Sequence, residues 1–83
     1  MTSIQEVQAV LDTIRDLLAE MYRGASSARD RLDEAIELLT ETSRTHHESL
    51  VPAGFAVVSE RMPDFLGQIS ASMQSVETLA ARL

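Results

Sequence analysis

Apolar residues recur at alternating steps of three and four along two long stretches of the chain. A mean step of about 3.5 residues places these side chains on one stripe of a helix, which is typical of a coiled-coil seam. In the first stretch the seam residues are Ile4, Val7, Leu11, Ile14, Leu18, Met21, Ala25, Ala28, Leu32, Ala35 and Leu39. In the second stretch they are Phe55, Val58, Met62, Phe65, Ile69, Ser72, Val76, Leu79 and Leu83. The pattern predicts two long helices that bury this seam.

Capping signals mark where the helices begin. Ser3-Ile4-Gln5-Glu6 has the capping-box pattern, so the first helix is predicted over about residues 4–42. Thr45-His46-His47-Glu48 repeats that pattern, Ser49 is a rival cap, and Pro52 would then stand in a first turn. The second helix is therefore predicted to begin between residues 46 and 51, and to run over about residues 48–83.

Two residues within the predicted helices interrupt helix propensity. Gly24 costs about 1 kcal/mol relative to alanine in a helix interior, but the seam stays in phase on both sides of it. We therefore expect one continuous first helix, with a hinge at Gly24 as the alternative. The seam also stays in phase across Pro63, which predicts a second helix kinked near that residue rather than a fresh helix start.

The helices are expected to fold back on each other near residue 46 as an antiparallel hairpin. Residues that face one another then have numbers that sum to about 92. This register sets the small residues Ala25 and Ala28 opposite Phe65 and Gly67, so that the two layers interlock without a void.

A second apolar line lies beside each seam, and it widens the apolar face to three positions per heptad. Faces of that width are typical of bundles, and a solitary hairpin would leave the second lines exposed. We therefore predict that the chain assembles with another subunit into a four-helix bundle or a larger helical assembly. The predicted interface residues are Val10, Leu17, Leu38, Leu66, Met73 and Ala80.

Length and composition narrow the class of protein. The 83 residues form a single domain, residues 1–83, without cysteine for disulfides or thiolate metal sites. Thirteen acidic residues against seven scattered basic ones give a net charge of −6, which argues against binding to nucleic acid or to an anionic membrane surface. No apolar run is long enough to span a membrane, and the first residues do not resemble a signal peptide. The expected location is the cytoplasm, with signal-less export left open.

No cluster of residues predicts catalysis, a cofactor site or a metal site. His46 and His47 are adjacent and point about 100° apart on a helix, and the Glu-x-x-His pair of di-iron bundles does not occur. An acidic cluster on the first helix is interpreted as a solvated face, with a basic partner as the alternative. It consists of Asp30, Asp33, Glu34, Glu37 and Glu41.

The layout resembles small actinobacterial all-helical proteins of uncharacterised function. The resemblance rests on an S-I-Q-E-V opening, a D-x-L-x-E-A-x-x-L-L run over residues 30–39, and an L-A-A-R-L ending. More loosely, the chain resembles the WXG100 hairpins of type VII secretion, which implies a dimerising hairpin exported without a cleaved signal. It departs from them in having no tryptophan and no C-terminal Tyr-x-x-x-Asp/Glu signal, since its one tyrosine is Tyr22.

The sequence therefore predicts a non-catalytic helical module for protein–protein interaction, which self-associates or docks on another helical protein. An exported WXG100-like hairpin, or a chaperone or adaptor of a bacterial secretion or toxin system, is the alternative. A small metal-dependent enzyme is a further alternative that would require bound iron, manganese or zinc.

Overall fold

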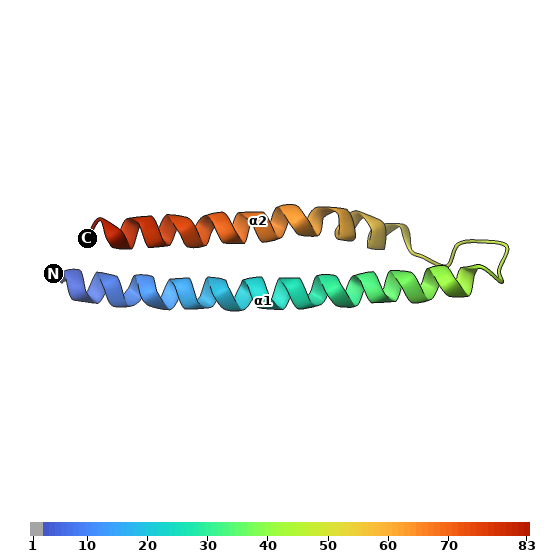
Figure 1. Cartoon of the computed structure of the whole chain (residues 1–83), viewed down its shortest axis with the longest axis horizontal. Coiled ribbons are helices and arrows are strands. Elements are labelled where there is room, and N and C mark those ends of the chain that lie inside the picture. Colours follow the sequence, from blue (N-terminus) through green and yellow to red (C-terminus); the bar gives the residue numbers. More distant parts are fainter. Residues whose placement is uncertain (1–2) are drawn as a thin grey trace.

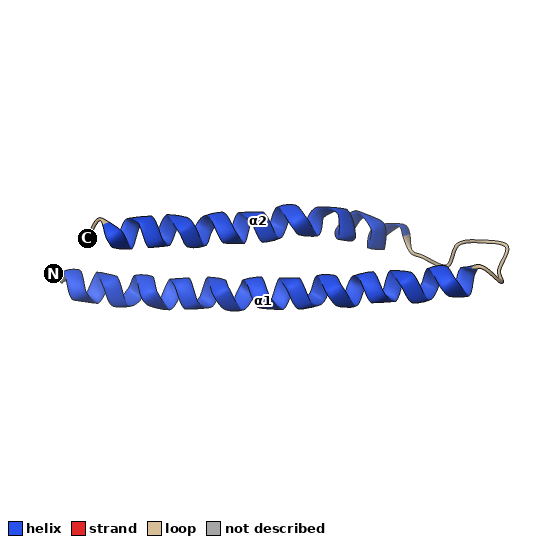
Figure 2. Ribbon diagram, viewed as in Figure 1, coloured by secondary structure: helices blue, strands red, loops and turns tan. Residues whose placement is uncertain are grey.

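The computed structural model describes residues 3–83 and contains two antiparallel helices joined by a loop (Figures 1 and 2). Helix α1 spans Ile4–Ser43 and helix α2 spans Ala53–Ala81. The hairpin is a rod of 66 × 17 × 15 Å, with both ends of the described chain at one end and the loop at the other. The predicted all-α hairpin is confirmed.

Helix α1 begins as the capping box predicts. Ser3 has extended backbone angles, and its Oγ accepts a hydrogen bond of 3.1 Å from the backbone N–H of Glu6. The helix then passes through Gly24 without interruption, so the alternative of a hinge there is wrong. A Cβ atom placed on Gly24 would meet nothing within 4 Å, so no contact within the hairpin requires glycine at this position.

Helix α2 begins at Ala53, five residues later than predicted. Thr45 caps no second helix; instead its hydroxyl donates a hydrogen bond of 3.1 Å to the carbonyl of Thr42. Pro52 is the N-cap residue, with extended backbone angles, and a residue that precedes proline avoids the helical region. The helix therefore cannot extend back from Pro52 through Val51, and residues 44–52 form a longer loop than expected.

One side chain fastens this loop to the end of α1. The Ser43 hydroxyl donates to the Leu39 carbonyl at 2.6 Å and accepts from the backbone N–H of Leu50 at 2.8 Å. Since Leu50 lies seven residues farther along the chain, this pair of bonds closes the loop over the helix end.

Pro63 lies inside α2, as predicted, and the helix continues through it. Figure 1 shows that α2 bends slightly toward its amino-terminal end. Proline leaves the carbonyl four residues earlier without its usual donor, which explains a local bend without a break.

A direct hydrogen bond shows the register between the helices. The Ser59 hydroxyl donates to Oδ1 of Asp33 at 3.1 Å, and the two residue numbers sum to 92, as predicted. The predicted interlock of small and large residues is wrong, because Phe65, Gly67 and Ala28 are exposed and a Cβ atom on Gly67 would meet nothing within 4 Å.

The hydrophobic core is thin, because two helices can enclose little. Among residues 3–83 only Leu11, Leu66 and Ile69 are buried, with 4–8% of their surface exposed. The remaining seam residues are half-buried or exposed. The hairpin therefore leaves thirteen large hydrophobic residues of the described chain exposed.

Helix α2 is turned relative to the predicted seam. Its covered residues still follow the three-four rhythm, but every second one lies one position farther along the chain than predicted. They are Phe55, Ser59, Met62, Leu66, Ile69, Met73, Val76 and Ala80. Val58, Phe65, Ser72 and Leu79 are exposed instead.

This turn corrects half of the predicted interface. Leu66 is buried, and Met73 and Ala80 are half-buried within the hairpin, so they do not form an uncovered line. Four residues belong to both the predicted and the observed seam, namely Phe55, Met62, Ile69 and Val76. Apolar residues lie on both sides of this row, and α1 can cover only one of the two sides. Burying the flank that contains Ser59 also provides the hydrogen bond to Asp33.

Candidate interaction surface

Helix α1 carries an uncovered apolar line, as predicted for Val10 and Leu17. These two residues and Leu38 have more than half of their surface exposed, at 56%, 54% and 63%. Two more exposed residues belong to this line. Ile14 lies between Val10 and Leu17, and Met21 follows Leu17. Spacings of four, three and four residues place Val10, Ile14, Leu17 and Met21 on one side of the helix.

Helix α2 carries a matching uncovered line that consists of residues predicted for the seam. Val58, Phe65 and Leu79 are 41–50% exposed, and Leu83 follows them beyond the helix end. Each of the first three comes directly before a covered residue, namely Ser59, Leu66 and Ala80.

The two lines lie on the same side of the hairpin. On α1, Val10 and Leu17 also come directly before the covered residues Leu11 and Leu18. A step of one residue turns the side chain by about 100° around the helix axis. In an antiparallel pair, the same step away from the seam on each helix leads to the same side of the pair. We call the resulting surface the apolar face. It consists of Val10, Ile14, Leu17 and Met21 from α1 and Val58, Phe65, Leu79 and Leu83 from α2.

Leu38 lies nearer the loop and apart from these four residues of α1. It occupies the same heptad position as Leu17, three heptads later, and it comes directly before the half-buried Leu39. The exposed Arg31 stands at the same heptad position between them, so a charged side chain separates Leu38 from the rest of the line.

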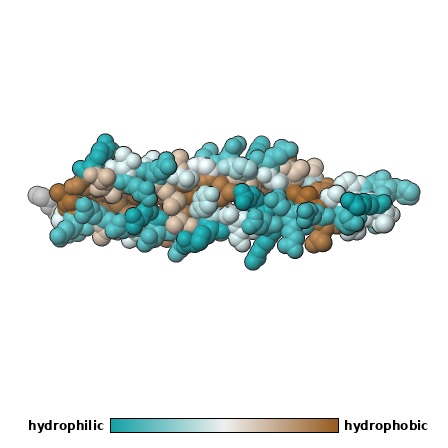
Figure 3. Space-filling view, viewed as in Figure 1, coloured by the Kyte–Doolittle hydropathy of each residue, from teal (hydrophilic) through white to brown (hydrophobic). Residues whose placement is uncertain are grey.

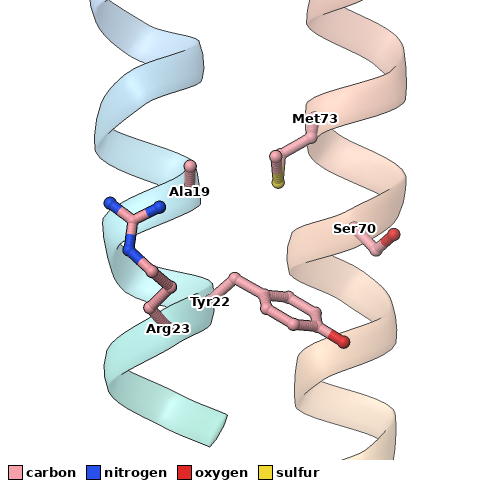
Figure 4. A pocket seen from close by; sticks show the side chains of 5 residues that line it. All are labelled: Ala19, Tyr22, Arg23, Ser70 and Met73. Carbon is pink, nitrogen blue, oxygen red and sulfur yellow. The ribbon is translucent and has the colours of Figure 1, made fainter.

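The face drawn in Figure 3 is mostly hydrophilic, with hydrophobic side chains gathered along the line between the helices. A shallow, open depression on the hairpin is lined by Ala19, Tyr22, Arg23, Ser70 and Met73. Figure 4 shows the Tyr22 ring and the Met73 side chain extending between the helices, while Arg23 extends away from α2. Tyr22 thus packs on the flank of the seam.

The other candidate groups are exposed and dispersed. His46, His47, Glu48 and Leu50 line an open depression at the loop. No group of three or more His, Asp or Glu side chains within residues 3–83 is close enough to hold a metal ion. In the same part of the chain no polar side chain is buried. The acidic cluster is exposed, and Asp33 makes the hydrogen bond to Ser59 described above.

Ion pairs contribute little to the hairpin. Those formed among the described residues are Arg15–Asp12, Arg29–Asp30 and Arg44–Glu41, at 3.3–3.8 Å. Each joins residues of α1, or of α1 and its cap, and the side chains are 37–73% exposed. Exposed pairs of this kind contribute about 0–1 kcal/mol each.

Neither described helix has a segment long and apolar enough to cross a lipid bilayer. Comparison of the chain with protein-family models, curated proteins and solved structures found no match.

Proposed function

We propose that this chain is a non-catalytic helical interaction module that binds another helical surface, its own or that of a partner protein, through the apolar face. The observation that carries the proposal is the amount of surface left uncovered. The hairpin exposes 6396 Å². A compact protein of the same mass would expose about 4,900 Å² by the usual scaling of surface with mass.

The energetics of burial support a helical partner. Full burial of a valine, leucine, isoleucine, phenylalanine or methionine side chain contributes about 1.5–3 kcal/mol. Val10, Leu17 and Phe65 are about half exposed, so covering the eight residues of the apolar face would contribute several kcal/mol. A helix, or a second pair of helices, matches the three-four spacing of the exposed line on α1, and the exposed residues Val58, Phe65 and Leu79 of α2 lie whole heptads apart.

The test is the association state of the purified chain and of one matched pair of variants. Leu17→Asp places a charge in the middle of the apolar face, at a residue that the hairpin does not bury. Leu50→Asp makes the same chemical change at an exposed leucine of the loop, outside both helices. We expect sedimentation velocity to show that the first variant loses association with itself or with a purified partner, and that the second retains it. Equal behaviour of the two variants would contradict the proposal.

The hairpin form also supports the alternative of an exported WXG100-like hairpin, or of a secretion chaperone or adaptor. That alternative predicts the protein in the culture medium when the secretion machinery is intact, or bound to a larger export substrate. Retention of the protein in the cells, without such a substrate, would remove it.

A further inference from the structure

The apolar line of α1 continues through two small residues and becomes complementary to itself. Beyond Met21 it proceeds to Gly24 and Ala28 at the same spacing. Two copies of α1 that run in opposite directions can be aligned so that residues whose numbers sum to 38 lie opposite one another. The larger side chains of Val10 and Ile14 then meet Ala28 and Gly24 of the other copy, and Leu17 meets Met21.

Helix α2 fits the same arrangement. The register of the hairpin relates residue numbers on the two helices by a sum of 92, as the Ser59–Asp33 bond shows. If paired residues on the two copies of α1 have numbers that sum to 38, paired residues on the two copies of α2 have numbers that sum to about 146. Phe65 of one copy then falls between Leu79 and Leu83 of the other, in the manner of a knob entering a hole.

Charged residues at the edges of the apolar face distinguish its two ends. Glu6 lies four residues before Val10, and Arg31 lies two heptads after Leu17. Arg61 lies between Val58 and Phe65 on α2, and the register sets it beside Arg31. Within residues 3–83 none of these three side chains forms an ion pair. One end of the face thus carries two arginines, with Glu34 and Asp64 one helical turn after them, and the other end carries a glutamate.

These charges favour one of the two ways in which copies can dock face to face. With the loops at the same end, α1 packs on α2 of the other copy, and Arg31 lies over Arg61 twice. Four arginines would then cluster, which opposes association. With the loops at opposite ends, α1 packs on α1 of the other copy, and Arg31 meets Glu6 twice.

We infer that the occupant of the apolar face is a second copy of this chain, docked face to face with its loop at the opposite end. The inference rests on the proposed function and adds the identity and the orientation of the partner. The hairpin exposes about 1,500 Å² more than a compact protein of its mass, and a standard interface covers about 800 Å² on each partner. The surplus is therefore large enough to accommodate an interface with one further copy.

The absence of cysteine allows a direct measurement of the orientation. A spin label on Glu37→Cys lies on α1 near the loop, away from the apolar face. With the loops at opposite ends, the two labels are separated by about 55 Å along the bundle at 1.5 Å per residue. With the loops at the same end, only the width of the bundle separates them, less than about 30 Å. Double electron–electron resonance on the dimer should give the long distance, and the short distance would overturn the proposed orientation.

Charge reversal provides a second test with opposite signs for the two orientations. Arg31→Glu should weaken the dimer about three- to tenfold, because it replaces two attractive pairs with repulsive ones. Adding Glu6→Arg should restore most of the affinity. If Arg31→Glu strengthened the dimer, the arginines would be facing each other, and the proposed orientation would be wrong.

The association state separates failure of this inference from failure of the proposed function. A monomer at every concentration from micromolar to submillimolar would overturn the inference. If a purified partner protein then bound the wild-type chain and Leu50→Asp but not Leu17→Asp, the proposed function would stand with a different occupant. If no partner distinguished the two variants, both would fall.

Discussion

Gly67 is a glycine within α2 that no contact in the hairpin explains. A Cβ atom added to it would meet nothing within 4 Å, and the residue lies on the side of the hairpin away from the apolar face. Glycine in a helix interior costs about 1 kcal/mol relative to alanine. We expect Gly67→Ala to raise the free energy of unfolding by about that amount in urea denaturation followed by circular dichroism.

Gly54→Ala is the matched control for that substitution. Gly54 also faces open space, but it lies in the first turn of α2, where helix ends fray. The gain there should be smaller. A loss of stability in Gly67→Ala would show that a contact absent from the hairpin requires glycine at this position.

Ser43 is the residue that holds the loop against the end of α1. Removing its hydroxyl breaks the bonds to Leu39 and Leu50. Since a hydrogen bond contributes about 0.5–1.5 kcal/mol net, Ser43→Ala should lower the free energy of unfolding by about 1–2 kcal/mol. Amide hydrogen exchange should speed up at Leu50.

Ser75→Ala serves as the comparison, because the Ser75 hydroxyl bonds only to the Ala71 carbonyl within its own helix. Alanine is a better helix former than serine, so this variant should be neutral or slightly more stable. Equal losses in the two serine variants would show that the loop is not fastened through Ser43.

The rotation of α2 about its own axis decides which of its apolar residues are core residues. Leu66 is 5% exposed and its neighbour Phe65 is 45% exposed. We expect Leu66→Ala to cost about 2–5 kcal/mol, enough to lose much of the helical signal in circular dichroism at low micromolar concentration. Phe65→Ala should keep that signal at the same concentration, because the hairpin leaves Phe65 half exposed. The reverse ranking would restore the seam predicted from the sequence.

The helices and their register were predictable, because strong local signals specify them. The Ser3 capping box gave the start of α1, and the unbroken rhythm predicted continuity through Gly24 and Pro63. The start of α2 was not predictable from its capping box, because Pro52 removes Val51 from the helical region and so outweighs Thr45.

The apolar face was predicted in part. Val10 and Leu17 were recognised on α1, where the covered residues directly follow them. On α2, Phe65 and Leu66 are adjacent apolar residues, and periodicity cannot tell which of them faces α1. The choice depends on cross-helix contacts such as the Ser59–Asp33 bond, which only the folded pair reveals.

At the scale of the whole molecule, residues 3–83 bury three core residues and leave a long exposed surface, so the stability of the fold should depend on protein concentration. Association stabilises the folded state by mass action when only that state binds. We expect the thermal midpoint of the wild-type chain to rise with protein concentration, and that of Leu17→Asp to stay constant. Differential scanning calorimetry over a wide concentration range would measure this, and a constant wild-type midpoint would argue against a second copy as the partner.

The shape of the rod also determines where anything attached to the protein would be held. Ser3 and Leu83 lie at the same end, while the loop lies at the far end of α1, which is about 60 Å long at 1.5 Å per residue. Tags or fluorophores joined to either terminus would therefore stay close to each other and remote from His46 and His47. In a pair with its loops at opposite ends, the chain would act as a spacer that displays one set of attachments at each tip.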